Sequence, residues 1–288
     1  MHIGLSRPKA PAPPIPDVDA AFVAHCAEAA GFESILYGEH PITPLSDGVT
    51  NVVHTEGVPY FQDAVVALAR VSAATKRIKF GFGICIVVQH NPVRLAKQLA
   101  GLDYYSGGRL LVGIGTGWNR VETEALGGRF EQRWAQTEEA IELARALWTQ
   151  DRVEHRGRFF KVDPVRCFPQ PAQAGGPPIL MGAGSDLALK RLAKYCDGWM
   201  PAFVTPDAIA NGAQTIRAGR AKVRAFAREL GREMNVVPVT AILRGDATRD
   251  DLKRFEDEGV ERVAISLPYF ETEAGARDKI EKLAAALL

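Results

Sequence analysis

His40 is the residue of this 288-residue chain that is best suited to proton transfer. It follows Glu39 directly after the apolar stretch 34–37, so we expect the imidazole at the end of a strand. Histidine exchanges a proton near neutral pH, as general acid–base catalysis requires. An arbitrary histidine is more often a surface loop residue, but the position at a strand end favours a catalytic role. His90, in the turn at 89–92, has a similar position and could instead bond only loop backbone.

Three Gly-x-Gly stretches could bring a ligand close to the backbone, because glycine has no side chain in the way. They are Gly81/Gly83, Gly113/Gly115/Gly117 and Gly182/Gly184, each at or near the end of an apolar run. The middle stretch does not match the dinucleotide fingerprint, since its spacing is G-x-G-x-G and no second strand ending in an acid follows about 20 residues later. Tight turns without a ligand account for most isolated glycine pairs. Three sets that converge on one edge instead favour a flat or phosphorylated cofactor.

The turn Gly182-Ala183-Gly184-Ser185 comes directly before a predicted helix. Free N–H groups and the helix dipole make such a turn attractive to phosphate. Ser185 could equally cap the helix, and the two roles are compatible. Trp118 and Trp199 follow or end predicted strands, where they could flank an aromatic ligand.

Composition excludes several classes of function. The 35 Lys and Arg residues balance 34 Asp and Glu, so neither nucleic acid nor an anionic membrane is an expected partner. No apolar run approaches the roughly 20 residues of a membrane span. The start, MHIGLSRPKA, lacks the order of a secretory signal, which predicts a cytoplasmic protein. Cys26, Cys85, Cys167 and Cys196 form no C-x-x-C pair, and we expect reduced structural thiols and no metal site.

The stretch 77–118 positions many of these groups. Residues 78–88 are apolar and β-branched enough for a strand buried on both faces. Pro92 can open a helix, the turn at 106–108 ends it, and 110–114 forms the next strand. The result is a parallel β-α-β unit with glycine and polar residues at the carboxyl ends of its strands. Ligands bind at that edge in α/β sheets and barrels.

The same alternation runs through the whole chain. Strands are predicted at 2–6, 34–37, 78–88, 110–114, 178–181, 198–201, 236–243 and 262–267, and helices at 17–29, 62–75, from 92, and at 134–148, 186–195, 206–230, 249–258 and 275–288. Asp17 is the expected cap of the first helix. Eight such units without a composition shift predict a single (β/α)8 TIM barrel over 1–288, with insertion segments near 41–60 and 150–176. The second insertion is predicted to form a β-hairpin or short extended strands at 153–171. An open doubly wound sheet is the alternative.

These stretches resemble the bacterial luciferase-like monooxygenase superfamily, and within it the branch of coenzyme F420-dependent oxidoreductases. The matching segments include SILYGEHP at 34–41, RIKFGFGICIVVQHNPVRLAKQLAGLDYYSGGRLLVGIGTGW at 77–118 and PPILMGAGSDLALKRLAKYCDGWMP at 177–201. The resemblance covers about 1–201 and is diffuse afterwards. It implies a luciferase-like barrel with a flavin or deazaflavin at its carboxyl mouth. It also implies a non-proline cis peptide bond in the third strand, which we place at Gly83-Ile84.

The resemblance implies roles for individual residues. His40 matches the active-site histidine, and Gly83 and Ile84 match the backstop of the ring. Thr116 and Gly117 match contacts to the cofactor tail. The cofactor-binding residues expected in full are Glu39, Gly83, Ile84, Gln89, Gly115, Thr116, Gly117, Trp118, Met181, Gly182, Ala183, Gly184, Ser185 and Trp199. Trp118 and Asn119 stand where some F420 enzymes have a glutamate proton donor, which argues against a sugar-phosphate dehydrogenase mechanism.

We therefore expect an enzyme that uses coenzyme F420 for hydride transfer to or from a small organic substrate. The alternative is an FMNH2-dependent luciferase-like monooxygenase. A non-catalytic flavin-binding protein, and a barrel that handles sugar phosphates without a redox cofactor, are further readings of the same pattern. Members of the superfamily often dimerise, which makes a homodimer a further expectation.

Overall fold

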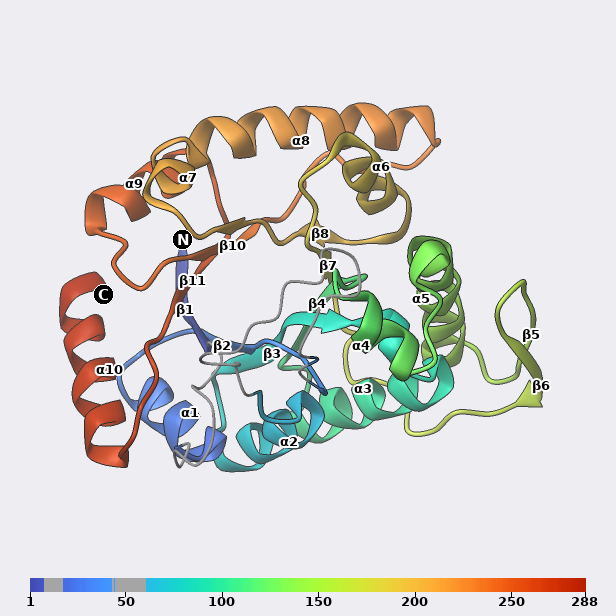
Figure 1. Ribbon diagram of the computed structural model, residues 1–288, viewed down its shortest axis with the longest axis horizontal. Helices are drawn as coiled ribbons and strands as arrows, with labels where there is room; N and C mark the ends of the chain where they lie inside the picture. The colour runs from blue at the N-terminus through green and yellow to red at the C-terminus, as the bar shows by residue number, and fades with distance from the viewer. Residues whose placement is uncertain (8–17, 43, 45–60) are drawn as a thin grey trace.

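Parallel strands form one curled sheet at the centre of the molecule, with helices around its outside (Figure 1). The computed structural model describes residues 1–7, 18–42, 44 and 61–288. In these residues the strands of the sheet are β1 (His2–Arg7), β2 (Ser34–Tyr37), β3 (Lys79–Ile86), β4 (Leu110–Gly115), β7 (Ile179–Met181), β8 (Gly198–Trp199), β9 (Ala202–Phe203), β10 (Thr240–Leu243) and β11 (Arg262–Ser266). Their order is β8-β7-β4-β3-β2-β1-β11-β10-β9, so strands that follow one another in the chain are neighbours.

The sheet closes through β8 and β9, which are two halves of one strand position. β8 pairs with β7, whereas β9 pairs with β10 on the other side. The Trp199 N–H also donates to the Pro238 carbonyl at 2.8 Å, which joins β8 to the segment that leads into β10. Counting β8 and β9 together gives eight strand positions in the described chain, so the predicted (β/α)8 barrel is confirmed and the open sheet is excluded.

The helices cover the barrel between successive strands (Figure 1). They are α1 (Ala20–Ala29), α2 (Ala64–Ala74), α3 (Pro92–Ser106), α4 (Arg120–Ala125), α5 (Arg133–Thr149), α6 (Asp186–Tyr195), α7 (Pro206–Ala210), α8 (Gly212–Glu229), α9 (Arg249–Asp257) and α10 (Glu273–Leu287). α3 illustrates how local sequence sets the ends. The Asn91 side chain accepts from the Arg94 N–H, Pro92 occupies the first turn, and Gly107 ends the helix with φ of 70°.

Several element boundaries differ from the sequence-based expectation, and three of them have a local cause. The cap of α1 is Asp19, which accepts from the Ala21 N–H, while Asp17 lies outside the described residues. The helix predicted at 206–230 is two helices, and the break places Gly212 against Phe255, where a Cβ would lie 2.4 Å from the ring. The strand predicted at 236–243 begins only at Thr240, because Pro238 has no N–H to donate to a ladder.

Two glycines of the Gly-x-Gly stretches lie inside strands and pack against protein atoms. A Cβ on Gly81 would be 1.8 Å from the Leu111 carbonyl oxygen, and one on Gly113 would be 2.4 Å from the Phe82 carbonyl oxygen. These glycines therefore allow close packing of strands, and the expectation that they admit a ligand is wrong. The barrel interior beside them is filled by Leu36, Leu111, Leu180, Met200, Ile242 and Ala264.

The predicted hairpin at 153–171 is confirmed as a separate two-stranded antiparallel sheet, β5 (Val153–Arg156) and β6 (Lys161–Val165). It projects from the barrel beside α5 (Figure 1). The Glu139 carboxylate of α5 anchors it by accepting from the backbone N–H groups of Phe159 and Phe160. Nearly all of the insertion expected near 41–60 lies outside the described residues.

An ion pair lies at the opposite end of the barrel from the strand carboxyl ends. Arg262, which begins β11 and is 2% exposed, donates from Nε and Nη2 to the two carboxylate oxygens of Glu33, at 2.6 and 2.7 Å. Burial alone would raise the pKa of Glu33, but the hydrogen bond and charge of Arg262 outweigh it and lower the pKa from 4.5 to about 2. Among the helices described, none is both long and apolar enough to cross a membrane.

Candidate active site

A cleft of about 790 Å3 opens at the carboxyl ends of β3, β7 and β10 and extends between α6 and α8. Six residues of the predicted cofactor-binding set line it: Gly83, Ile84, Gly182, Ala183, Gly184 and Trp199. Gln214, Thr215 and Lys222 of α8 form its outer wall, and the sequence pattern did not single them out. The cleft has the size of a typical cofactor site and lies at the edge where barrel enzymes place their chemistry.

The peptide bond between Gly83 and Ile84 is cis, so the position implied by the family resemblance is confirmed. Both residues line the cleft. The pairing of β3 with β4 shifts register between Phe82 and Cys85, so the strand is irregular at this bond. A Cβ on Gly115 would lie 2.2 Å from Ile84 Cδ1. Gly115 therefore acts through Ile84, because it makes room for the side chain that forms the cleft wall.

The turn at 182–185 joins β7 to α6 on one side of the cleft. Ser185 caps α6 by accepting from the Ala188 N–H, so the capping part of its prediction is confirmed. No described atom lies within 4 Å of a Cβ built on Gly184, which leaves the backbone there open to a ligand. The Trp199 indole N–H donates to the Ala183 carbonyl at 2.9 Å and holds the turn against the barrel. Met181, one residue earlier, is buried beneath it.

His40 lies just after β2 and bonds a carboxylate that sequence reasoning missed. Its Nδ1 is 2.8 Å from Oε2 of Glu122, on the first turn of α4. The Glu122 side chain is 1% exposed, whereas that of His40 is 22% exposed. The His40 ring contacts Phe61, at 4.8 Å between centroids, and meets Trp118 edge-on, at 6.1 Å. The available signal for Glu122 was an acid in the first turn of a short helix that Asn119 caps, directly after the glycine-rich loop.

Phe61 connects His40 to the cleft wall. Its Cε1 lies 3.4 Å from a Cβ built on Gly38, and the Gly83 carbonyl oxygen lies 3.7 Å from the same point. The imidazole is therefore one aromatic ring away from the cis peptide bond. His40 does not itself line the cleft, and its role in proton transfer stays a prediction.

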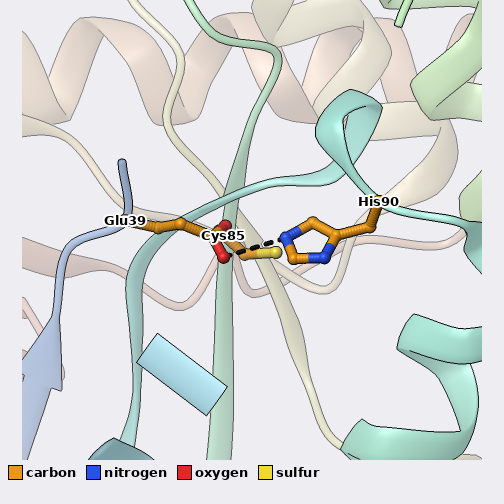
Figure 2. Close-up of side chains that lie close together, drawn as sticks. All are labelled: Glu39, Cys85 and His90. Atoms are coloured by element: carbon orange, nitrogen blue, oxygen red, sulfur yellow. Dashed lines mark hydrogen bonds and ion pairs between the residues drawn. The ribbon is translucent and has the colours of Figure 1, made fainter. Parts of the chain in front are cut away.

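Glu39, the neighbour of His40, belongs to a different cluster. Its Oε1 is 2.9 Å from His90 Nε2, and its Oε2 accepts from the Ile86 N–H at 2.8 Å. Figure 2 shows the Cys85 sulfur beside this carboxylate, and the ligand-type atoms of Glu39, Cys85 and His90 lie within 4.8 Å of one another. The sequence did not predict this trio. Both carboxylate oxygens already accept hydrogen bonds, so the cluster reads as an internal network, and His90 bonds a carboxylate instead of only loop backbone.

The charge of Glu39 sets the ionisation of its neighbours. Burial raises the pKa of the Cys85 thiol well above its ordinary value, and the Glu39 charge raises it further. Burial alone would lower the pKa of His90, but its hydrogen bond to Glu39 and the carboxylate charge outweigh this effect and raise it. The thiol is therefore unreactive, and the imidazole acts as a hydrogen-bond donor to Glu39.

Buried polar atoms gather behind His40, near Gly117. The Gln89 amide has no hydrogen-bond partner in the described residues at either its nitrogen or its oxygen, and the same holds for Thr123 Oγ1 and Glu122 Oε1. Gln89 Nε2 and Thr123 Oγ1 both lie within 4 Å of a Cβ built on Gly117, whose φ is 74°. Thr116 is buried beside it. Unpaired buried polar groups are costly, so Gln89 and Thr123 beside Gly117 have free capacity to bond a further polar group.

The residues of the cleft fit a flavin or deazaflavin. Ile84, Trp199 and Ile242 supply apolar walls for a flat ring, and the open backbone at 182–184 supplies polar groups without side chains. Lys222 Nζ, paired with Asp186 Oδ1 at 2.7 Å, adds a cation at the outer end. The predicted site residues that do not line this cleft are His40, Glu39, Gln89, Gly115, Thr116, Gly117, Trp118, Met181 and Ser185.

Comparisons with known proteins show which family and fold the chain shares. The family model described as luciferase-like monooxygenase matches residues 18–256. An uncharacterized protein of Mycobacterium tuberculosis (strain ATCC 25618 / H37Rv) is 30% identical over 278 residues, which cover 94% of each chain. The F420-dependent hydroxymycolic acid dehydrogenase of the same strain is 29% identical over 245 residues, 83% of this chain and 64% of the dehydrogenase. Among solved structures, monooxygenase RslO1 from Streptomyces bottropensis has a TM-score of 0.79 at 20% identity, covering 100% of this chain and 98% of that one.

Proposed function

Because the chain belongs to the luciferase-like monooxygenase family, we propose that it is an oxidoreductase that binds coenzyme F420 in the cleft and exchanges a hydride with a small organic substrate. One observation carries the proposal. A cleft of cofactor size has the Gly83-Ile84 peptide in its wall, with a carboxylate-bound histidine one aromatic ring away. The cleft would hold the ring, and the histidine would handle the proton that accompanies hydride transfer.

F420 is preferred over FMN because of sequence similarity to a dehydrogenase of known cofactor. The hydroxymycolic acid dehydrogenase that matches 83% of this chain is F420-dependent by name. The likeness to monooxygenase RslO1, at 20% identity, supports the fold alone. An FMN-dependent monooxygenase is therefore the second candidate function for this cleft. Measuring the binding of both cofactors distinguishes the two functions.

Bound F420 supplies the redox chemistry, since it accepts a hydride from a substrate carbon and returns it in the reverse direction. The contribution of this chain is binding, orientation and proton transfer. The Gly83 and Ile84 backbone and the Trp199 ring form the walls that position the cofactor. His40 takes the substrate hydroxyl proton when an alcohol is oxidised to a carbonyl, and gives it back when the carbonyl is reduced. Phe61 and Trp118 flank the imidazole and limit its contact with water.

The test is a titration of the purified protein with F420 and, separately, with FMN, followed by cofactor fluorescence. We expect micromolar binding of F420, and loss of that binding when Gly184→Asp places a side chain and a negative charge in the open turn. A panel of small alcohols, aldehydes and ketones, assayed by the change in F420 absorbance, then identifies a substrate. Tight binding of FMN with none of F420 would replace the proposal by the monooxygenase, and binding of neither would overturn it.

A further inference from the structure

We propose that Glu122 is the positioning residue for His40. Its carboxylate accepts a hydrogen bond from the Nδ1–H of the imidazole. Nε2 is then the ring nitrogen that exchanges a proton with substrate. The assignment deepens the proposed function and rests on it. It was not available from the sequence, where Glu122 lies 82 residues from its partner.

Among the described residues, the Glu122 carboxylate makes one hydrogen bond, to His40. Its side chain is 1% exposed, and Oε2 lies 2.8 Å from His40 Nδ1. The second oxygen, Oε1, has no hydrogen-bond partner among the described residues, and no Lys or Arg pairs with this carboxylate there. A buried carboxylate with a single partner costs stability, because removing its charge from water is compensated only in part. A purely structural acid at this position would be expected to satisfy both oxygens, as Glu39 does.

The contact decides which imidazole nitrogen is available. A carboxylate only accepts hydrogen bonds, so the nitrogen that faces it must carry a hydrogen. His40 is therefore held with Nδ1 protonated, whatever the state of Nε2, and Nε2 has no hydrogen-bond partner among the described residues. A histidine whose Nδ1 donates to a buried carboxylate is fixed in both tautomer and ring orientation.

The surroundings hold Glu122 in place. The Asn119 side chain accepts from the Glu122 N–H at 3.0 Å and caps α4, which fixes the start of the helix. The rings of Phe61 and Trp118 pack near the imidazole, with centroids 4.8 and 6.1 Å away. The rigid part of the site is thus the carboxylate, and the half-buried histidine takes its orientation from it.

The first experiment records nitrogen-15 NMR spectra of the histidine rings, with the His40 signals identified from their absence in His40→Ala. In wild-type protein without cofactor we expect a protonated Nδ1 at His40. In Glu122→Gln this preference should be lost, since an amide can present either an oxygen or an N–H to the ring. A wild-type His40 with an unprotonated Nδ1 would overturn the assignment without need of any variant.

The second experiment measures kcat and KM for a substrate from the alcohol and carbonyl panel. Glu122→Gln should lower kcat about 10- to 100-fold, part of the 10²- to 10⁴-fold that a general acid or base contributes, with KM and the F420 Kd changed less than about threefold. In the His40→Ala background the same substitution should have no further effect. Equal losses in both backgrounds would show that Glu122 does not act through His40.

Glu124→Gln is the matched control, because Glu124 lies two residues further along α4, is exposed and, in the part of the chain that the structure describes, forms an ion pair only with Arg120. Its rate and its His40 spectrum should equal those of the wild type. The outcomes separate the two proposals. If F420 and FMN both fail to bind, the proposed function is wrong, and the spectra still test Glu122. If F420 binds and His40→Ala is inactive while Glu122→Gln keeps the full rate, only the role of Glu122 is wrong.

Discussion

Two histidine–carboxylate pairs lie at the mouth of the barrel, and each takes one member from adjacent residues at the end of β2. Glu39 bonds His90, which follows β3, while His40 bonds Glu122, which follows β4. The distances are almost equal, at 2.9 and 2.8 Å. The pairs differ in how many of their oxygen and nitrogen atoms have hydrogen-bond partners. Glu39 uses both oxygens, whereas among the described residues Glu122 Oε1 and His40 Nε2 have no hydrogen-bond partner.

The difference separates a structural pair from a reactive one. A fully bonded network, such as Glu39 with Cys85 and His90, holds the loop after the cis peptide bond in position. A pair with unsatisfied atoms next to a cleft retains the capacity to bond something else. Identical functional groups at neighbouring positions therefore have different roles because of the strands and helices that face them.

The largest effect on kcat is expected when the pair of His40 and Glu122 is broken. His40→Ala should lower kcat by at least about 100-fold, since proton transfer to a positioned histidine contributes 10²- to 10⁴-fold. The F420 Kd should change less than about threefold. His90→Ala should lower stability and keep kcat within about threefold. Steady-state kinetics and cofactor titration of both variants measure this contrast. Similar rate losses in the two variants would remove the distinction between the pairs.

Glu33, at the other end of the barrel, provides a comparison because its carboxylate only stabilises the fold. Glu33→Gln should lower the free energy of unfolding by about 3 kcal/mol, because it removes the carboxylate that contacts buried Arg262 most closely and leaves only the more distant Glu261, at 3.8 Å. The pKa of Glu33 is lowered from 4.5 to about 2, so its contribution is present above about pH 4.5 and is lost as the pH falls towards 2. Urea unfolding at several pH values measures both. A change in kcat at neutral pH would contradict the assignment.

A smaller loss is expected when the structural pair at the mouth is broken. Glu39→Gln retains an acceptor for the Ile86 N–H but removes the charge that holds His90. We expect the free energy of unfolding to fall by about 2 kcal/mol, as for other hydrogen bonds to a buried charged group. Urea denaturation provides the measurement, with Glu124→Gln as the exposed control, for which a change below about 0.5 kcal/mol is expected. A stability equal to the wild type would show that the network does not hold the loop.

The smallest expected effect is the pH dependence of the stability that His90 contributes. The pKa of His90 is raised above 6.5, since the hydrogen bond and charge of Glu39 outweigh its burial. Protonated His90 therefore stabilises the fold fully below about pH 6.5, and this contribution is lost as the pH rises through the raised pKa. The stability advantage of the wild type over His90→Gln should be larger near pH 6 than near pH 9, as measured by urea unfolding. An advantage that grows with pH would reverse the assigned sign.

Local features of the fold were predictable from the sequence. β2 and α6 have the predicted bounds, since alternation, caps and glycine stops act within a few residues. His40 could be placed beside the cleft because the end of β2 is marked in the chain. The helix predicted at 206–230 begins and ends close to its predicted bounds, but it is divided at Asn211. Gly212 there contacts Phe255, which is far away in the sequence.

What the amino-acid sequence determined by itself is the succession of strands and helices, and with it the closed barrel and the side of the molecule on which His40 lies. Only the tertiary structure decided which groups meet there. Glu122 reaches His40 across 82 residues, and His90 reaches Glu39 across 51. The physical reason is that backbone preferences depend on neighbours along the chain, whereas a hydrogen bond between side chains depends on where barrel closure places the ends of separate strands.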